Sequence, residues 1–143
     1  MILVPVKDLS TAKQRLAGVL DQQRRTQLAQ AMLKDVLGAL PKVPSRPPVM
    51  VITGDPFGRA LAAYHGFEIL DDPTNPGETG AIEMATRAAE AAGAEFTLVF
   101  PGDIPLVTPD EIEAVLQVAP ARGTVLVPAA VAGNAGVLLG GSF

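Results

Sequence analysis

The sequence predicts an α/β fold, a Rossmann-like three-layer sandwich built on a mostly parallel sheet. Short apolar runs alternate with longer amphipathic stretches, which is typical of strands joined by crossover helices. Each apolar run is nearly continuous, as expected for strands that are buried on both faces. With 143 residues and 48% hydrophobic side chains, residues 1–143 are expected to form a single domain around one core.

The first predicted strand covers residues 1–6 and is closed by Pro5. Ser10 or Thr11 is suited to cap a first helical stretch. A strong helix is predicted over residues 24–40, because apolar side chains recur there every fourth residue. These are Leu28, Met32, Val36 and Leu40. A proline-rich connector then ends the helix.

Two further strands are predicted at residues 49–53 and 67–70. Between them, Asp55 followed by Pro56 reads as a helix N-cap with proline at the first helical position. Gly66 is placed to end that helix as the residue after its C-cap.

The second half of the chain continues the alternation. Residues 81–92 form an alanine-rich helix, and its small side chains predict a close approach to the sheet. A strand follows at 96–100, and Thr108 with Glu111 then forms a capping-box pattern. The buried stripe of the helix that starts there is Ile112, Val115 and Leu116. The last strands are predicted at 124–127 and 135–139.

Charge is unevenly distributed along the chain. The net charge is −4, yet the first 25 residues hold five of the eleven basic side chains against two acids. This asymmetry favours a local anion site over a nucleic-acid surface, which needs a broader basic face. Aromatic residues make up only 4% of the chain, so we expect no nucleic-acid partner.

Composition also excludes several classes of site. There is no Cys and a single His, which argues against disulfides, thiolate metal sites and a Cys–His catalytic pair. No apolar run is long enough to span a membrane, and the amino terminus lacks the apolar region of a signal peptide. We therefore expect a cytoplasmic protein with no membrane partner.

Ligands in open α/β sheets bind at the carboxyl ends of the strands. In chain order, the polar groups expected there are Lys7-Asp8, Thr53-Gly54-Asp55, Asp71-Asp72 and Pro101-Gly102-Asp103. The loop after the first strand contains Lys7, Lys13 and Arg15 and leads into a helical stretch. Such an arrangement can bind phosphates. The alternative is that these cations are ordinary solvated side chains, as we expect for Arg24 and Arg25.

Asp103 is the candidate metal ligand. It directly follows a buried strand and lies between two prolines, and such a fixed carboxylate suits Mg²⁺ completed by phosphate oxygens. The competing interpretation is a carboxylate that caps a turn. Asx turns are the preferred explanation for Asp71 and Asp72, and His65 is read as a helix-end residue.

Two stretches carry a family resemblance. VPVKDLSTAKQRLAGVL with the following QRRTQLAQAMLKDVLGAL, and TLVFPGDIPLVTPDEIEAVL later, closely resemble the phosphoenolpyruvate/2-phospho-L-lactate guanylyltransferases. The resemblance covers about residues 1–128 and implies a nucleotidyltransferase fold related to that of nucleotide-diphospho-sugar transferases. It also implies transfer of GMP from GTP to a small phosphoacid during deazaflavin coenzyme biosynthesis, with release of pyrophosphate. The acceptor would be phosphoenolpyruvate, 2-phospholactate or 3-phosphoglycerate.

The resemblance assigns roles to individual residues. Lys7, Lys13, Arg15 and Asp103 would be catalytic, and Asp103 would also bind Mg²⁺ as the one cofactor. The nucleotide would be bound by Pro5, Val6, Lys7, Lys13, Arg15, Thr53, Asp55, Gly77, Gly80, Pro101 and Gly102.

The chain departs from the family pattern in two places. The loop at residues 76–80 differs from the family's usual run, and Ala129-Ala130 stand where the family tends to carry an Asp-Arg pair. The uncharged tail suggests a shortened or altered carboxyl terminus. Two alternatives therefore stay open: a nucleotidyltransferase with another base or acceptor, and a nucleotide- or partner-binding module with little activity. An open sheet edge also favours a homodimer.

Overall fold

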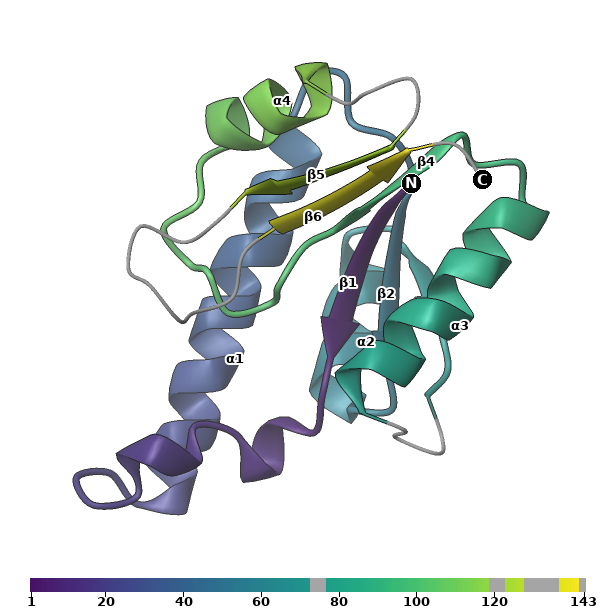
Figure 1. Cartoon of the computed structure of the whole chain (residues 1–143). Coiled ribbons are helices and arrows are strands. Elements are labelled where there is room, and N and C mark those ends of the chain that lie inside the picture. The colour runs from purple at the N-terminus through teal and green to yellow at the C-terminus, as the bar shows by residue number, and fades with distance from the viewer. Residues whose placement is uncertain (73–76, 119–122, 128–136, 142–143) are drawn as a thin grey trace.

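The computed structural model describes residues 1–72, 77–118, 123–127 and 137–141. Within these residues, six strands form one sheet in the order β3-β2-β1-β4-β6-β5 (Figure 1). The order places β1 in the middle of the sheet, between β2 and β4. The chain reverses its direction of growth across the sheet on either side of β1, which creates a crevice at the carboxyl end of that strand.

The four strands on the β3 side of the sheet are parallel. They are β1 (Ile2–Val6), β2 (Val49–Thr53), β3 (Glu68–Leu70) and β4 (Phe96–Val99). β6 (Val137–Gly141) runs antiparallel to β4, and β5 (Gly123–Val127) pairs antiparallel with β6 at the edge. The predicted α/β class with a mostly parallel sheet is confirmed.

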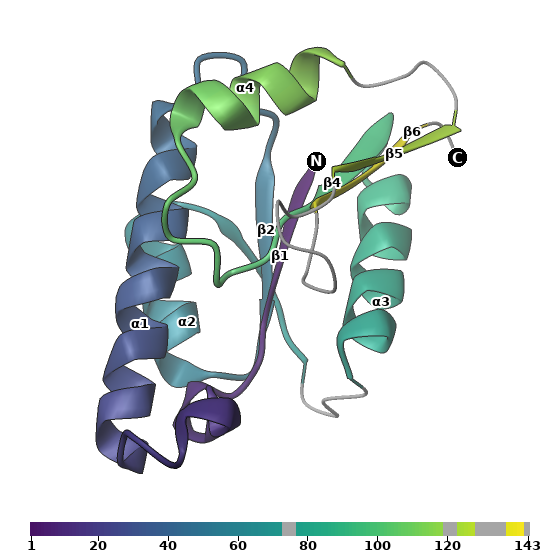
Figure 2. The ribbon, with the colours of Figure 1, turned by 60° about the vertical axis from the view of Figure 1, so that its left-hand side comes forward.

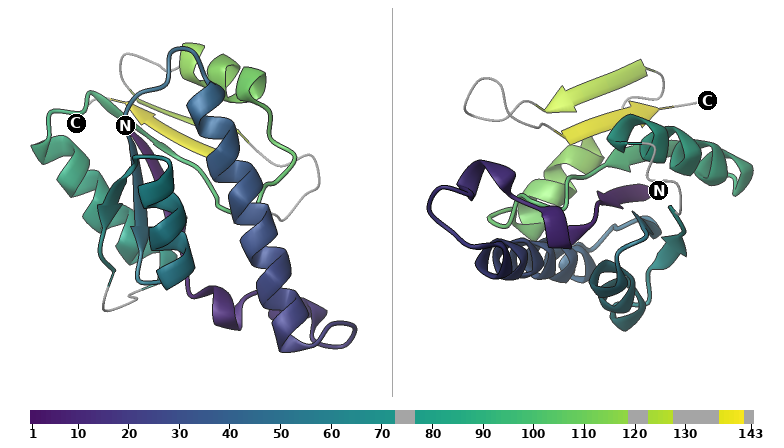
Figure 3. Two further views of the ribbon diagram at one scale, coloured as in Figure 1. Left: turned by 180° about the vertical axis from the view of Figure 1, so that it is seen from behind. Right: turned by 90° about the horizontal axis from the view of Figure 1, so that it is seen from below.

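Helices cover both faces of the sheet, so the molecule has three layers (Figure 2). α1 (Gln22–Ala39), α2 (Pro56–Tyr64) and α4 (Pro109–Gln117) lie on one face, and α3 (Glu78–Ala91) lies on the other. The view from behind shows α1 and α2 side by side in front of the strands (Figure 3). Three short 3-10 turns complete the helical structure of the described residues: η1 (Leu9–Thr11), η2 (Gln14–Leu16) and η3 (Leu40–Lys42).

Alternate side chains of β1 feed two apolar clusters. Ile2 and Val4 pack with Leu33 and Leu37 of α1 on one face of the sheet. Leu3 packs on the opposite face with alanines of α3. Three of these alanines, four residues apart, are almost completely buried: Ala81, Ala85 and Ala89. The expected close approach of this helix to the sheet is therefore confirmed, since a methyl group is the largest side chain that faces the strands at these positions.

Local signals located most element boundaries. Asp55 caps α2 with Pro56 in its first turn, and Thr108 forms a complete capping box with Glu111 at α4. His65 is the C-cap of α2, and Gly66 adopts the left-handed conformation with φ of +69°. The first helical stretch differs from the prediction. It is two separate 3-10 turns, with Asp8 as the cap of the first one in place of Ser10 or Thr11.

Candidate functional site

A pocket of about 550 Å³ lies at the carboxyl ends of β1 and β4. Its walls come from the end of β1 (Pro5, Val6), the turns η1 and η2, the α1 side chains Ala29 and Leu33, and the segment Pro101–Asp103. The crevice predicted by the strand order is thus present, and it is lined by the loop that carries the amino-terminal cations.

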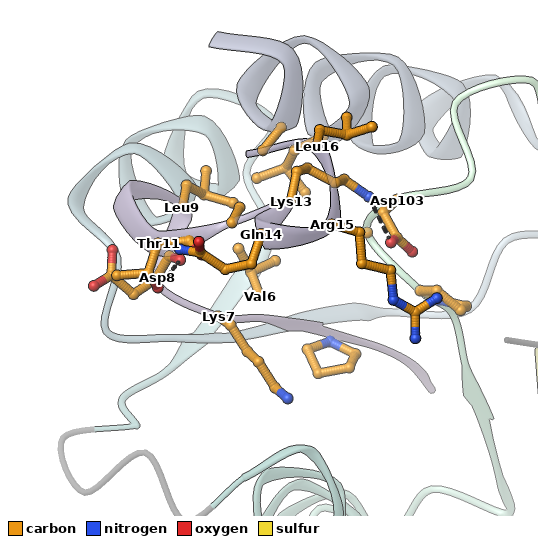
Figure 4. Close-up of a pocket in the computed structure, with 16 residues that line it drawn as sticks. Val6, Lys7, Asp8, Leu9, Thr11, Lys13, Gln14, Arg15, Leu16 and Asp103 are labelled. Carbon is orange, nitrogen blue, oxygen red and sulfur yellow. Dashed lines mark hydrogen bonds and ion pairs between the residues drawn. The ribbon is translucent and has the colours of Figure 1, made fainter. Parts of the chain in front are cut away.

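Lys13 connects the two sides of this pocket. It is the one non-glycine residue with positive φ in the described part of the chain, at +56°, and it stands just before η2. Its Nζ donates a hydrogen bond to Asp103 Oδ2 at 2.9 Å, and the two form an ion pair (Figure 4). The Lys13 side chain is 23% exposed and that of Asp103 is 55% exposed, so the pair remains open to solvent and to a ligand.

Lys7 and Arg15 also line the pocket. Figure 4 shows both side chains extending from the loop on the same side, with Lys13 and Asp103 above them. Lys7 is exposed and has an interaction of its own, so it is not a free cation. The three cations proposed to grip phosphates thus gather around one end of β1, because the loop folds back over that strand.

Pro101 and Gly102, which precede Asp103, also line the pocket. A Cβ atom built on Gly102 would lie 3.1 Å from Leu33 Cδ1 and 3.7 Å from Val6 Cγ2. The backbone immediately before Asp103 therefore lies close to side chains of α1 and β1.

Arg25 corrects one expectation from the sequence. Arg24 has a 71% exposed side chain, as expected for a solvated helix face, whereas Arg25 is only 7% exposed. Its guanidinium donates to Gln14 Oε1 at 3.1 Å and to Gln22 Oε1 at 2.6 Å. Arg25 lies on the same face of α1 as Ala29, one turn away, and this face packs beneath the pocket loop.

Thr53 and Asp55 lie outside the lining of this pocket. Thr53 is completely buried, and its Oγ1 accepts from the Asp55 backbone N–H at 2.9 Å. Both carboxylate oxygens of Asp55 accept backbone N–H groups, one from Gly58 at 2.9 Å and the other from Leu9 at 3.0 Å. These two residues join the start of α2 to the loop after β1, which is a supporting contact for that loop.

The other predicted nucleotide-binding residues lie at the start of α3. Gly77 is its N-cap with φ of +90°, and Gly80 is in the first turn of the helix. Neither lines the pocket beside Lys13. Pro76, Ala129 and Ala130 lie outside the described residues.

Asp71 and Asp72 follow β3, and neither lines the pocket. Asp71 forms an ion pair with Arg59, and one oxygen of Asp72 is buried without a hydrogen-bond partner. His65 stacks on Phe67 with 5.4 Å between ring centroids, and partial burial lowers the pKa of His65. The position of His65 at the end of α2, away from the residues that line the pocket, agrees with its predicted helix-end role.

Asp103 is the residue of the pocket best suited to a divalent cation. Its carboxylate is exposed, faces the pocket and supplies the hard oxygen donors that Mg²⁺ prefers, with substrate phosphates able to complete the coordination. The other acid in the lining, Asp8, accepts from the Ser10 N–H at 2.8 Å, and its hydrogen bonds to Ser10 lower its pKa. No group of three acidic or histidine side chains that could hold a metal occurs among the described residues.

Sequence reasoning did not assign Gln14 to the site. This side chain lines the pocket and contacts both Arg25 and the backbone of η1. The sequence did contain a signal for its partner Arg25. The four-residue spacing of Arg25, Ala29 and Leu33 places all three on one helix face. Since Leu33 is a core residue, that spacing also brings Arg25 to the buried face.

No helix among the described residues combines the length and apolar character needed to cross a membrane.

Comparison with solved structures identifies the fold. A Desulfovibrio desulfuricans protein assigned to the nucleotide-diphospho-sugar transferases superimposes with a TM-score of 0.78 at 18% identity, covering 99% of this chain and 62% of that one. A cytidylyltransferase from Leptospira borgpetersenii gives a TM-score of 0.67 at 14% identity, covering 98% and 59% of the two chains. These similarities support the predicted nucleotidyltransferase type of fold.

Comparison with curated proteins identifies closer relatives. A phosphoenolpyruvate guanylyltransferase of Conexibacter woesei is 37% identical over 114 residues, which are 80% of this chain and 51% of that protein. Another from Roseiflexus castenholzii is 36% identical over 127 residues, 89% of this chain and 57% of that protein. The chain therefore spans little more than half the length of these relatives. The model of the family described as "Guanylyl transferase CofC like" matches residues 1–141, and the chain belongs to this family.

Proposed function

We propose that the pocket at the carboxyl ends of β1 and β4 binds the triphosphate of GTP for transfer of GMP to a small phosphoacid. The observation that carries the proposal is the Lys13–Asp103 pair, which places a cation and an exposed carboxylate 2.9 Å apart inside a pocket also lined by Lys7 and Arg15. The relatives' names indicate phosphoenolpyruvate as the acceptor. The alternatives 2-phospholactate and 3-phosphoglycerate carry the same phosphate and carboxylate groups.

The reaction requires positioning and charge neutralisation. A phosphate oxygen of the acceptor forms a bond to the α-phosphorus of GTP, while the bond from that phosphorus to the bridging oxygen breaks and pyrophosphate leaves. The attacking oxygen is already anionic, so no activated serine or histidine base is needed. Mg²⁺ held by Asp103 would neutralise phosphate charge, and Lys7, Lys13 and Arg15 would orient the triphosphate.

We assign Gly77 and Gly80 to a second, outer part of the proposed site, whereas the buried Thr53 and Asp55 support the loop after β1. Asp55 braces the loop after β1 through the Leu9 N–H. Gly77 and Gly80 present the amino-terminal end of α3 on the other face of the sheet. We propose that the guanine or ribose lies toward this end, with the phosphates toward Lys13.

The proposal is tested by incubating the protein with Mg²⁺, each nucleoside triphosphate and each acceptor while pyrophosphate release is followed. We expect release with GTP and phosphoenolpyruvate that depends on Mg²⁺ and is strongly reduced in Asp103→Ala. Release with CTP or UTP instead would support a nucleotidyltransferase with another base. Absence of release, with a melting temperature still raised by GTP, would support a binding module.

A further inference from the structure

We infer that Arg25 is a positioning residue of the phosphate-binding loop and that it acts through Gln14 on Lys13. This inference rests on the proposed function of the pocket. Arg25 is buried beneath a loop that bears three cations. Burying another positive charge there costs free energy, which indicates that the arginine has a role in that loop. In the described part of the chain, no carboxylate pairs with its guanidinium, and its Nε has no hydrogen-bond partner.

The contacts of Arg25 form a chain that ends at the loop backbone. One guanidinium nitrogen donates to Gln14 Oε1 at 3.1 Å, and the Gln14 amide nitrogen donates to the Thr11 carbonyl at 2.9 Å. Gln14 therefore holds η1 and η2 together, because Thr11 ends the first turn and Gln14 begins the second. A second guanidinium nitrogen fixes Arg25 itself to α1 through Gln22 at 2.6 Å.

Lys13 lies within the segment that this chain closes. Only Ala12 and Lys13 separate Thr11 from Gln14, and Lys13 holds the left-handed conformation that side chains other than glycine rarely adopt. A bridge from Gln14 to the Thr11 carbonyl stabilises this tight reversal. The reversal in turn directs the Lys13 amine to Asp103, and Figure 4 shows the side chains of Gln14 and Lys13 emerging from the same turn.

The planar fork of Arg25 explains why an arginine suits this position. It donates to two glutamines in different directions at once, which a lysine ammonium on a flexible stem does with less geometric restraint. Its positive charge, without a paired carboxylate among the described residues, also adds to the potential that attracts a polyanion. Arg25 thus supports the site from beneath without contacting the ligand.

The test measures binding of inorganic pyrophosphate in the presence of MgCl₂ by titration calorimetry. Arg25→Met keeps the apolar stem and removes the fork, and Arg24→Met is the matched control on the exposed neighbouring position. We expect Arg25→Met to weaken binding by about tenfold, comparable to losing one charge-assisted hydrogen bond, and Arg24→Met to bind like the wild type. Equal affinity of the two variants would overturn the inference.

Gln14→Ala tests the same link from its exposed end, where a folding defect is not expected. It should weaken pyrophosphate binding as Arg25→Met does, and the double variant should lose no more than either single variant, because both remove one connection. Additive losses would contradict action through Gln14.

Hydrogen exchange separates this inference from the proposed function. The Leu16 N–H bonds to the Lys13 carbonyl at 2.9 Å and the Ala17 N–H to the Gln14 carbonyl at 3.0 Å, so both report on η2. We expect exchange at these two amides to be about tenfold faster in Arg25→Met and unchanged in Arg24→Met. If the wild type does not bind pyrophosphate, the proposed phosphate site is refuted. If amide exchange is unchanged in Arg25→Met, positioning by Arg25 is refuted.

Discussion

Asp55 and Asp103 occupy equivalent places in the sequence and have opposite environments in the structure. Each is the third residue of a triplet with glycine in the middle, and each follows a buried strand adjacent to β1. Asp55 is 9% exposed and its two oxygens accept backbone N–H groups, whereas the Asp103 side chain is 55% exposed and pairs with Lys13. A strand-end aspartate therefore reveals its role only through what surrounds its oxygens.

The largest effect is expected for Asp103→Ala on catalysis. Removing the carboxylate would leave Mg²⁺ without its protein ligand and should reduce GTP-dependent pyrophosphate release by about 10²–10³-fold or more, as when one preorganised charge-stabilising group is lost. The stability change should stay below about 1 kcal/mol, since the Lys13–Asp103 pair is open to solvent. Steady-state kinetics with urea denaturation as control measures both, and retained turnover would refute the role of Asp103.

Asp55→Ala should give the inverse result, a large loss of stability. It removes the N-cap of α2 and leaves the Leu9 N–H without its acceptor. These losses together should lower the free energy of unfolding by about 2–4 kcal/mol. Urea denaturation followed by circular dichroism measures the change. A loss below about 1 kcal/mol would show that water or another group replaces the carboxylate.

Substitution by asparagine sharpens the comparison. Asp55→Asn keeps one oxygen for the Gly58 N–H but turns an NH₂ toward the Leu9 N–H, so we expect an intermediate cost of about 1–3 kcal/mol. Asp103→Asn is expected to be nearly as inactive as Asp103→Ala, because the amide oxygen is a hard donor but lacks the negative charge of the carboxylate. Denaturation and kinetics of both variants, side by side, check the pair. Activity restored by asparagine at 103 would show that charge is not required there.

These two aspartates also show how far sequence reasoning reaches. The positions of the strands along the chain and the N-cap role of Asp55 followed from local signals, namely buried apolar runs and a following proline. The same signals could not show that the second oxygen of Asp55 accepts from Leu9, since that contact spans 46 residues. They also could not separate Asp55 from Asp103, because exposure depends on which loop folds over each strand end.

The amino-terminal loop shows the same limit. The gathering of Lys7, Lys13 and Arg15 was predictable from their position after β1. The buried state of Arg25 was not assigned, although its spacing from Leu33 contained the signal. The positive charge of Arg25 led to its interpretation as a solvated side chain, whereas a tertiary contact between α1 and the loop buries it. The two 3-10 turns arose for a similar reason, since Gln14 bonds to the Thr11 backbone where a longer helix was expected.

The two glycines that precede these aspartates are expected to respond differently to alanine. A Cβ on Gly54 would lie 3.1 Å from the backbone oxygen of Asp72, whereas one on Gly102 would lie 3.1 Å from the end of the Leu33 side chain. A side-chain end can shift more easily than a backbone oxygen, so Gly54→Ala should cost about 1–3 kcal/mol and Gly102→Ala less than about 1 kcal/mol. Urea denaturation ranks the two variants. The reverse order would mean that Leu33 is the more rigid neighbour.

The smallest effect concerns Thr108, an N-cap which, like Asp55, is followed by proline but which is exposed. Thr108→Ala should cost about 1 kcal/mol by loss of the cap. Hydrogen bonds from Thr108 lower the pKa of Glu111, so the stabilisation they provide is present above the ordinary carboxyl pKa and is lost as pH falls through the lowered value.

In Thr108→Ala the pKa of Glu111 should rise only part of the way toward its ordinary value, because the backbone N–H of residue 108, which is the larger cause of the lowered pKa, still donates to the carboxylate. An NMR titration of the side-chain carboxyl measures this change. The pKa of Glu113 is lowered by Ser45 and serves as the internal control. A Glu111 pKa that does not change in this variant would show that the backbone N–H of residue 108 lowers it without help from the hydroxyl. Caps that contact only their own helix would then contribute less to stability than Asp55, whose second oxygen accepts a hydrogen bond from the loop of the proposed site.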